Sequence, residues 1–342
     1  MSGKRQKRGR RGRGGGLAAG ALLLAALCLF GSTVWALYNG RDGGIVPLVY
    51  ASMSAAPDRP APSLRPSEVP LASAAPTAAP VDLAGLNSAC AILERVDTGE
   101  VLAAKNADRR AAPASLTKLM TAALVLEDDP DLSGSVTLAQ DIFPELYAQN
   151  ASRAGFEPGE TVAKKDLFYG MLLPSGAECC AALAREAAGS ESAFVAEMND
   201  KAAELGLADT HFVNTTGLDA EEHYTTAADL AALLRYALRD PAFRAAFTAR
   251  SYATQATNVH PDGITFYSTM FKSLPGPAVQ GGEILGGKTG YTDAAGLCLA
   301  SLAEVDGVEY VLITLGAPGD HTTEQFNITD AVNVYGRLGR DY

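Results

Sequence analysis

Residues 282–290 read GEILGGKTG and match two incompatible motifs. One is G-x-x-x-x-G-K-[ST], a loop that leaves a strand, wraps nucleotide phosphates and enters a helix. The other is the triplet Lys288-Thr289-Gly290, which lies on a strand beside the nucleophile in one class of serine acyl-transferases. The two motifs require different folds, because only the first needs a helix after the lysine and a parallel sheet around it.

The chain after Thr289 argues against the phosphate loop. Residues 290–305, GYTDAAGLCLASLAEV, place two glycines and a Thr-Asp turn before a run that resembles a strand. A phosphate loop must instead lead directly into a helix, whose N-terminus holds the phosphates. Only 52 residues follow Gly290, which is too few for the parallel sheet of a nucleotide-binding fold.

The K-T-G interpretation predicts a nucleophile elsewhere in the chain, and Ser115-Leu116-Thr117-Lys118 supplies one just after Pro113. Residues i and i+3 share a helix face, so the Lys118 amine can reach the Ser115 hydroxyl. The positive end of the helix and desolvation both favour a neutral lysine, which can act as a general base. The alternative is that Ser115 only caps the helix and that Lys118 is solvated, because S-x-x-K is frequent by chance.

A second serine is expected between these two motifs, as Ser-x-Asn at the helical side of the site. Ser175-Gly176-Ala177 follows Pro174 and precedes a helical pattern. The alternative is a capping box, because Ser175 and Glu178 have the S-x-x-E spacing. Capping and catalysis are compatible, since both use a serine hydroxyl at a helix end.

Strands are predicted at both ends of the folded region and helices between them. Strand pairs are expected over 90–105, with a turn at Asp97-Thr98-Gly99, and over 297–317, with a turn at Asp306-Gly307. Apolar periodicity and capping residues predict three helices. These helices span residues 113–127, 191–206 and 225–238, the last with Thr225 or Thr226 as cap. The pattern predicts an α/β (α+β) domain with one antiparallel sheet and a helical insert.

Over about residues 85–317 the chain resembles the low-molecular-mass penicillin-binding proteins, the serine-type D-alanyl-D-alanine carboxypeptidases. Four blocks carry the resemblance in the same order: PASLTKLMTA (113–122), GETVAKKDLFYGMLLPSGAE (159–178), FVNTTGLDAEEHYTTAADLA (212–231) and GGKTGYTDAAGLCLAS (286–301). The resemblance implies a DD-peptidase/β-lactamase-like fold, with a five-stranded antiparallel sheet packed with helices and a helical subdomain. It also implies peptidoglycan stem peptides as substrate, β-lactams as inhibitors, and no metal or organic cofactor.

The resemblance assigns three catalytic side chains. Ser115 would attack the carbonyl between the two terminal D-alanines, and Lys118 would take its proton. Ser175 would relay that proton to the leaving amine.

The same resemblance assigns the substrate-binding groups to the strand motif. The backbone N–H groups of Ser115 and Tyr291 would form the oxyanion hole. Lys288 and Thr289 would bind the terminal carboxylate, and Gly290 would let the strand approach the substrate.

Two departures from the family pattern raise alternatives. Ala177 stands where relatives commonly have Asn, so a weakened homologue that binds cell wall without turnover is one alternative. Loop 316–325 has His321 where some relatives place an arginine near the substrate carboxylate. No second, all-β domain is expected after Tyr335.

Two further enzyme classes fit this pattern less well. A β-lactamase needs a deacylating glutamate after the Ser-x-Asn element, whereas the candidate loop at 143–150, FPELYAQN, precedes Ser175. A zinc peptidase is disfavoured, because the histidines lack H-E-x-x-H spacing and are expected to be structural. These histidines are His211, His223, His260 and His321.

The N-terminal region predicts export of the folded domain. Residues 1–16 form a basic head, and residues 17–38 contain 22 residues without a charge, enough for a transmembrane helix. Basic residues before such a segment keep that end cytoplasmic. A cleaved signal peptide is the alternative. Residues 39–80 are predicted to be a disordered Pro/Ala-rich linker, and residues 81–342 the catalytic domain.

The remaining charge excludes a nucleic-acid partner. The first 13 residues hold seven of the 28 Lys and Arg, which leaves 21 basic against 39 acidic residues and a net charge of −18. Such a body would repel a phosphate backbone. The five cysteines follow no metal-binding spacing and are expected to be small buried apolar residues.

Overall fold

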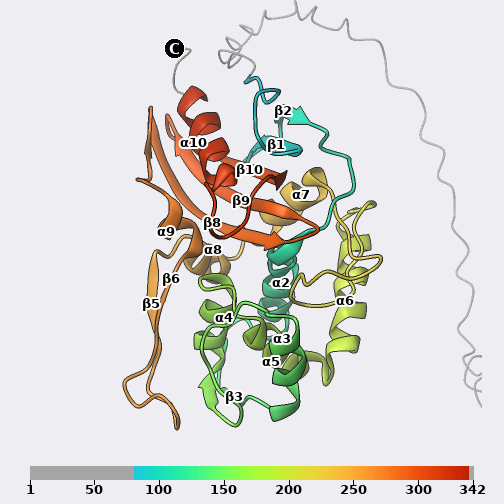
Figure 1. Cartoon of the computed structure of the whole chain (residues 1–342), viewed down its shortest axis with the longest axis vertical. Helices are drawn as coiled ribbons and strands as arrows, with labels where there is room; N and C mark the ends of the chain where they lie inside the picture. The colour runs from blue at the N-terminus through green and yellow to red at the C-terminus, as the bar shows by residue number, and fades with distance from the viewer. Residues whose placement is uncertain (1–80, 339–342) are drawn as a thin grey trace, which may run out of the picture. The chain divides into compact units, whose positions relative to one another are not determined.

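The computed structural model describes residues 81–338, and its central sheet has the strand order β2-β1-β10-β9-β8-β7 (Figure 1). All neighbouring strands in this sheet are antiparallel. The strands are β1 (Cys90–Arg95), β2 (Val101–Lys105), β7 (Ala278–Val279), β8 (Gly282–Thr292), β9 (Gly296–Val305) and β10 (Val308–Ala317). The five-stranded antiparallel sheet is confirmed, with β7 added at one edge. A strand of two residues is too short to show the alternation by which strands are recognised in a sequence.

Both predicted hairpins are present. Asp306 and Gly307 have φ angles of 51° and 74° at the turn between β9 and β10, which suits the left-handed turn of a two-residue hairpin. The strands that come first and last along the chain, β1 and β10, pair with each other in the middle of the sheet, where Cys90 lies opposite Leu315. This pairing joins the two ends of the folded region, and the long helical segment lies between β2 and β7 in the chain.

Helices cover both faces of the sheet, so its strands are apolar on both sides. The helix α10 (Phe326–Leu338) packs on one face, in a cluster with Leu299 and Leu312. The helix α7 (Ala227–Ala237) packs on the other face, in a cluster with Ala300 and Ile313. Adjacent residues of one strand therefore belong to different clusters, as a pleated strand requires.

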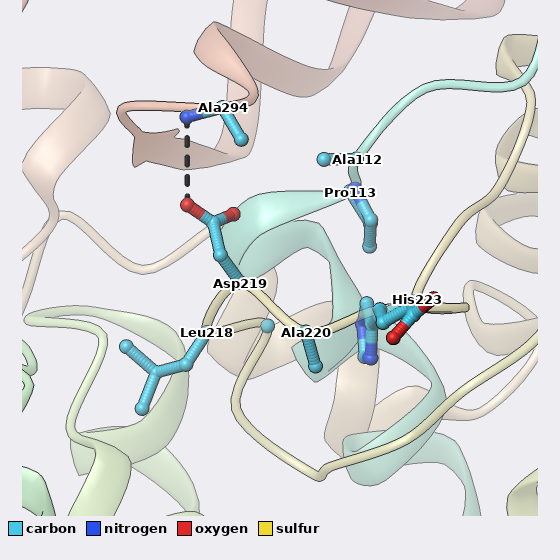
Figure 2. Close-up of a pocket in the computed structure, with 9 residues that line it drawn as sticks. Ala112, Pro113, Leu218, Asp219, Ala220, His223 and Ala294 are labelled. Atoms are coloured by element: carbon cyan, nitrogen blue, oxygen red, sulfur yellow. Dashed lines mark hydrogen bonds between the residues drawn. The ribbon is translucent and has the colours of Figure 1, made fainter.

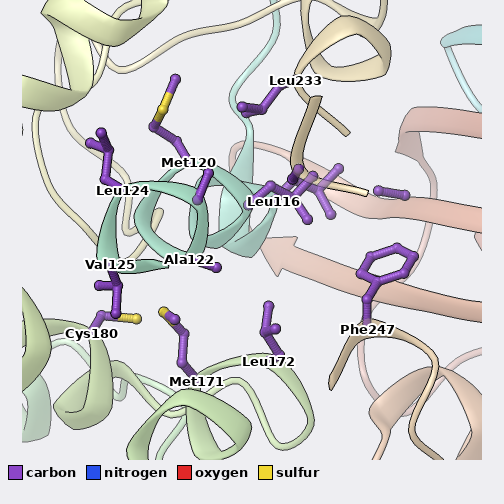
Figure 3. Packing of buried hydrophobic residues seen from close by; sticks show 14 of the residues in the cluster. Leu116, Met120, Ala122, Leu124, Val125, Met171, Leu172, Cys180, Leu233 and Phe247 are labelled. Atoms are coloured by element: carbon purple, nitrogen blue, oxygen red, sulfur yellow. The ribbon is translucent and has the colours of Figure 1, made fainter. Parts of the chain in front are cut away.

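A buried helix, α2 (Lys118–Asp128), forms the centre of the helical region. Every residue from Lys118 to Leu126 is buried, and side chains such as Leu116, Met120 and Val125 meet neighbours in different directions (Figure 3). A helix that is apolar all round belongs inside a protein. The surrounding helices are α3 (Phe143–Ala148), α4 (Lys164–Leu172), α5 (Ala177–Ala188), α6 (Glu191–Glu204), α8 (Pro241–Phe247) and α9 (Thr269–Ser273).

The predicted helix boundaries agree with local capping. A short 3₁₀ turn, η1 (Ala114–Thr117), precedes α2. The helix α6 ends just before Gly206, which has a φ of 74°. The hydroxyl of Thr226 caps α7 by accepting a hydrogen bond from the Asp229 N–H. The remaining short elements are η2 (Gln140–Ile142) and two hairpins, β3 (Ser135–Thr137) with β4 (Thr161–Ala163) and β5 (Ser251–Ala253) with β6 (Thr265–Tyr267).

The predictions for residues 1–16, 17–38 and 39–80 concern residues outside the described part of the chain. Within residues 81–338, no helix has the length and apolar character needed to cross a bilayer. The four cysteines of the described range are all buried and unpaired, as expected, whereas Cys28 lies outside that range.

Candidate active site

Ser115 and Lys118 lie together where η1 runs into α2. The Lys118 ammonium donates to Ser115 Oγ at 3.0 Å and to the backbone carbonyl of Thr216 at 2.6 Å. The lysine is only 2% exposed. The alternative of a helix cap beside a solvated lysine is therefore wrong, because Ser115 lies inside η1 and Lys118 is buried.

The backbone before Ser115 is held in an unusual conformation. Ala114 has a φ of 47°, in the left-handed region that alanine seldom adopts. Gly217 packs against the Ala114 carbonyl so closely that a Cβ at residue 217 would overlap it. Strained backbone of this kind persists only where the surrounding structure fixes it, and it concentrates at functional sites.

Ser175 reaches the same place from the connection between α4 and α5. Its Oγ donates to Ser115 Oγ at 3.0 Å, and its φ of 69° is again left-handed. The capping-box alternative is wrong, because Gly176 is the N-cap residue of α5. The Glu178 carboxylate instead accepts hydrogen bonds from the N–H groups of Ala154 and Gly155.

Lys288 comes from the sheet side. Its ammonium donates to Ser175 Oγ at 2.9 Å and to the Thr289 carbonyl at 2.7 Å, and the residue is 1% exposed. The four side chains therefore form one hydrogen-bonded row in the order Lys118, Ser115, Ser175, Lys288. Because β8 continues from Gly282 through Thr292 as a strand, the phosphate-loop interpretation is wrong.

A glycine lets the strand come close to the nucleophile. A Cβ on Gly290 would lie 3.1 Å from the Ala114 Cβ and 3.2 Å from the Ser115 nitrogen. Such distances are shorter than ordinary van der Waals contact. The absence of a side chain therefore lets β8 run directly beside η1.

Burial lowers the pKa of both lysines. Desolvation lowers the pKa of Lys118 below its usual 10.5, and the charges of Cys180, Glu178 and Cys179 oppose this only in part. Desolvation lowers the pKa of Lys288 still further, and the nearby positive charge of Lys118 adds to the effect. A lysine that loses its proton readily can take a proton from a neighbouring hydroxyl.

Two cavities meet at Ser115 and form a groove. One has a volume of about 410 Å³ and extends toward the helical region, and the other, of about 280 Å³, extends along β8. Ser115, Ser152, Tyr291 and His321 line both of them. Thr289 lines the second cavity, whereas the buried Lys288 lies behind its wall.

The structure adds a functional loop, residues 214–218, that no sequence pattern had singled out as part of the site. The Asn214 side chain accepts from the N–H groups of Thr216 and Gly217, which turns the loop sharply. That turn aims the Thr216 carbonyl at Lys118. The Asn-Thr-Thr-Gly sequence was visible, but a carbonyl that binds a distant lysine has no sequence pattern.

A second addition is Thr269, the first residue of α9. Its hydroxyl lies 2.6 Å from the Thr289 hydroxyl, and both threonines line the cavity beside β8. Together they place two hydroxyl groups next to Gly290.

The two departures from the family pattern lie at the groove. Ala177 is 1% exposed and lines the larger cavity with Ser115 and Lys118. His321 is exposed, and its ring meets the edge of the Tyr291 ring with centroids 4.7 Å apart.

The other three histidines have partners in the fold. His211 binds the Glu222 carbonyl, His260 binds the Glu160 carboxylate, and His223 binds the Thr117 hydroxyl. Among residues 81–338, no three His, Cys, Asp or Glu side chains are grouped so as to hold a metal ion.

Comparison with known sequences relates this geometry to one family. A family model described as D-alanyl-D-alanine carboxypeptidase, peptidase S11, matches residues 75–319. The chain is 34% identical to the D-alanyl-D-alanine carboxypeptidase DacF of Bacillus subtilis (strain 168) over 66% of this chain and 57% of that protein. It is 31% identical to DacB2 of Mycobacterium tuberculosis over 72% of this chain and 84% of that protein. It thus spans less than two thirds of the length of DacF.

Solved structures give the same relationship. The crystal structure of the Streptomyces K15 DD-transpeptidase superposes with a TM-score of 0.66 at 27% identity, covering 74% of this chain and 97% of that one. A D-alanyl-D-alanine carboxypeptidase from Mycobacterium tuberculosis H37Rv gives a TM-score of 0.60 at 27% identity, covering 72% of this chain and 89% of that one.

Proposed function

Because the chain belongs to the D-alanyl-D-alanine carboxypeptidase family, peptidase S11, we propose that it removes the terminal D-alanine from peptidoglycan pentapeptide stems. The reaction would pass through an acyl-enzyme on Ser115. The single observation that carries the proposal is the hydrogen-bonded row Lys118, Ser115, Ser175, Lys288, whose first three members line the groove.

In the acylation step, neutral Lys118 takes the proton of Ser115, whose Oγ bonds to the carbonyl carbon between the two D-alanines. The C–N bond to the leaving D-alanine then breaks, and Ser175 relays the proton held by Lys118 to the amine nitrogen. Ser175 is placed for this relay because its Oγ lies 3.0 Å from Ser115 Oγ, which Lys118 also contacts, and because Lys288 holds Ser175 with a hydrogen bond. Positioned proton transfer of this kind contributes about 10²–10⁴-fold to a rate.

The oxyanion of the tetrahedral intermediate would accept hydrogen bonds from the backbone N–H groups of Ser115 and Tyr291. One such donor contributes about 2.7–4 kcal/mol. The approach of Gly290 to the Ser115 nitrogen supports this arrangement, because it brings the two backbone segments side by side. Water then hydrolyses the ester on Ser115 and releases the shortened stem.

The substrate carboxylate would bind along β8. Thr289 and Thr269 offer hydroxyl groups at the cavity wall, and the amine of Lys288 lies directly behind them. A carboxylate placed there would favour the protonated form of Lys288, because an opposite charge stabilises it. β-Lactams would acylate Ser115 in the same groove and act as inhibitors.

We also propose that residues 17–38 anchor the protein in the cell membrane and that the linker at 39–80 carries an extracytoplasmic catalytic domain. The charge-free stretch after a basic head supports this placement. Cleavage of that stretch would release the same domain. Membrane fractionation of the full chain, compared with a chain that lacks residues 1–38, distinguishes the two outcomes.

The activity is tested by D-alanine release from a pentapeptide ending in D-Ala-D-Ala, with and without penicillin. We expect release that penicillin abolishes, and no release from the Ser115→Ala variant. Peptide binding without release would support the weakened wall-binding homologue suggested by Ala177. Rapid turnover of penicillin would support a β-lactamase instead.

A further inference from the structure

A second row of hydrogen bonds, separate from the catalytic row, ends at the carbonyl of Ala114, the residue before the nucleophile. His223 lies in the loop before α7 and is 6% exposed. Its Nδ1 accepts from the Val213 N–H at 3.0 Å, and its Nε2 lies 2.9 Å from Thr117 Oγ1. Thr117 Oγ1 in turn lies 2.9 Å from the Ala114 carbonyl oxygen, to which it donates.

These contacts fix every proton in the row. A backbone N–H can only donate, so Nδ1 of His223 carries the lone pair and Nε2 carries the proton. The Nε2–H therefore donates to the Thr117 hydroxyl, whose own proton points to the Ala114 carbonyl. The row has one direction, from Val213 through His223 and Thr117 to Ala114.

The end of the row belongs to the peptide unit that also carries the Ser115 N–H. In a trans peptide the C=O of one residue and the N–H of the next point in opposite directions from one plane. The Ala114 oxygen is held on the buried side by Thr117 and by the packing of Gly217. The Ser115 N–H must therefore point away from that oxygen, and β8 passes close to the nitrogen, since a Cβ added to Gly290 would lie 3.2 Å from it.

We propose that His223 is a positioning residue that orients the oxyanion-binding N–H of Ser115 through the Thr117 hydroxyl. The left-handed φ of 47° at Ala114 supplies the reason, because such a conformation is strained and needs an external hold. This inference rests on the proposed acyl-transfer function. It adds two residues that the catalytic row does not use.

The surroundings of His223 keep it neutral. Burial lowers its pKa to about 4, with His211 lowering it further and Asp219 opposing the shift. Figure 2 shows the His223 ring near Pro113 and the Asp219 carboxylate turned toward the Ala294 N–H, from which it accepts a hydrogen bond at 3.4 Å. These residues and Glu221 line a cavity of about 280 Å³. Lys118 follows Thr117 in sequence, but its ammonium is directed to Ser115 and Thr216.

The direct test compares Thr117→Val with Thr117→Ser. Valine keeps the shape and removes the hydroxyl, whereas serine restores it. We expect Thr117→Val to lower the rate constant for acylation by fluorescent penicillin about 10–100-fold, since loss of one oxyanion donor costs 10²–10³-fold. Thr117→Ser should stay within about threefold of the unmodified protein, and the KM for pentapeptide should change less than kcat in both.

Two controls separate positioning from general damage. Thr248→Val removes a partly buried hydroxyl that likewise donates to a helix carbonyl, that of Arg244, but does not line the groove. It should leave acylation unchanged. Thermal melting of each variant identifies those that fail to fold.

His223→Gln gives an independent readout, because a glutamine amide can donate to Thr117 but does not titrate near pH 4. The ratio of its acylation rate to that of the unmodified protein should rise as the pH falls from 6 to 4. The titration of Lys118 is common to both proteins and cancels. His260→Gln removes a histidine whose partner is the Glu160 carboxylate and should give a flat ratio.

The inference would be overturned if folded Thr117→Val acylated as fast as the unmodified protein. It would also be overturned if Thr117→Ser were as slow as Thr117→Val. A flat pH ratio for His223→Gln would do the same. D-alanine release by the unmodified protein is measured in parallel. Absence of release would count against the proposed function, whereas the acylation ratios test the positioning role.

Discussion

The two walls of the groove are built in different ways. The sheet wall is a regular strand, in which Lys288, Thr289 and Gly290 pair in register with three residues of β9. The helical wall consists of turns, among them the left-handed Ser175 and the loop at 214–218 folded around the Asn214 side chain. The catalytic row joins the two walls at the contact between Ser175 and Lys288.

The difference shows where this fold can vary. Each residue of the sheet wall is held by a backbone ladder, so its placement depends little on the side chain. The residues of the helical wall are held by specific side-chain contacts, and two of them, Ala114 and Ser175, have left-handed φ angles. The departure at Ala177 lies on the helical wall, where a side chain can change without breaking a ladder.

The largest expected effect comes from Lys118 on the helical wall. Lys118→Arg keeps a long nitrogen-bearing side chain but cannot act as a base, because arginine stays protonated. We expect the acylation rate constant to fall at least about 10³-fold, within the range for loss of a general base. Stopped-flow measurement with a fluorescent penicillin checks it. A fall of less than tenfold would mean that another group takes the Ser115 proton.

The pH dependence of acylation should follow the same lysine. The neutral amine is the active form, so the rate should rise about tenfold per pH unit and then level off. Because burial lowers the pKa of Lys118, the break must lie below 10.5. A rate that still rises at pH 10.5 would contradict a buried, desolvated base.

A side chain on the sheet wall should push the two walls apart. Gly290→Ala places a Cβ 3.1 Å from the Ala114 Cβ and 3.2 Å from the Ser115 nitrogen. We expect acylation to slow about tenfold, because small displacements of reacting groups are costly. Gly276→Ala is the matched control, since no atom lies within 4 Å of the added carbon. Equal rates for both variants would show that the walls tolerate separation.

A larger polar side chain at Ala177 on the helical wall should raise activity, whereas a side chain at Gly290 should lower it. Ala177→Asn would add an amide beside Ser115 and Lys118 in the larger cavity. One added hydrogen bond contributes about 0.5–1.5 kcal/mol, so we expect kcat/KM for pentapeptide to rise severalfold. Ala177→Leu has a similar volume without the amide and should lower activity. If both variants behave alike, the cavity at Ala177 has no room for a productive contact.

The smallest effect is expected where the walls touch at the rim. Asp219 from the helical wall accepts from the Thr292 hydroxyl at 2.6 Å at the end of β8, and both groups are partly in solvent. Asp219→Asn should change kcat/KM only about two- to threefold, because exposed contacts contribute little. Glu221→Gln serves as the neighbouring control. A change in kcat/KM above tenfold would show that the groove needs the contact between Asp219 and Thr292 to keep its active shape.

The sheet wall was readable from the sequence because its information is local. The K-T-G triplet, the Asp306-Gly307 turn and the apolar strands around it all depend on neighbouring residues. Ser115 and Lys118 were equally accessible, since their spacing alone places them on one turn.

The helical wall was readable only in part. The S-x-x-E spacing at Ser175 fits a capping box, but the left-handed backbone there moves the helix start to Ala177 and frees Glu178 for the loop at Ala154. The Thr216 carbonyl and the hydrogen bond between His223 and Thr117 join segments about a hundred residues apart. Contacts of that kind follow from tertiary packing, and no local pattern encodes them.

The central claim is that Ser115, and no other hydroxyl, becomes acylated. Brief exposure of the protein to benzylpenicillin, followed by acid quenching and peptide mass mapping, tests it directly. One adduct on the peptide that contains Ser115, absent from the Ser115→Ala variant, is the predicted result. An adduct on the Ser175 peptide, or no adduct while pentapeptide is still hydrolysed, would contradict the assignment.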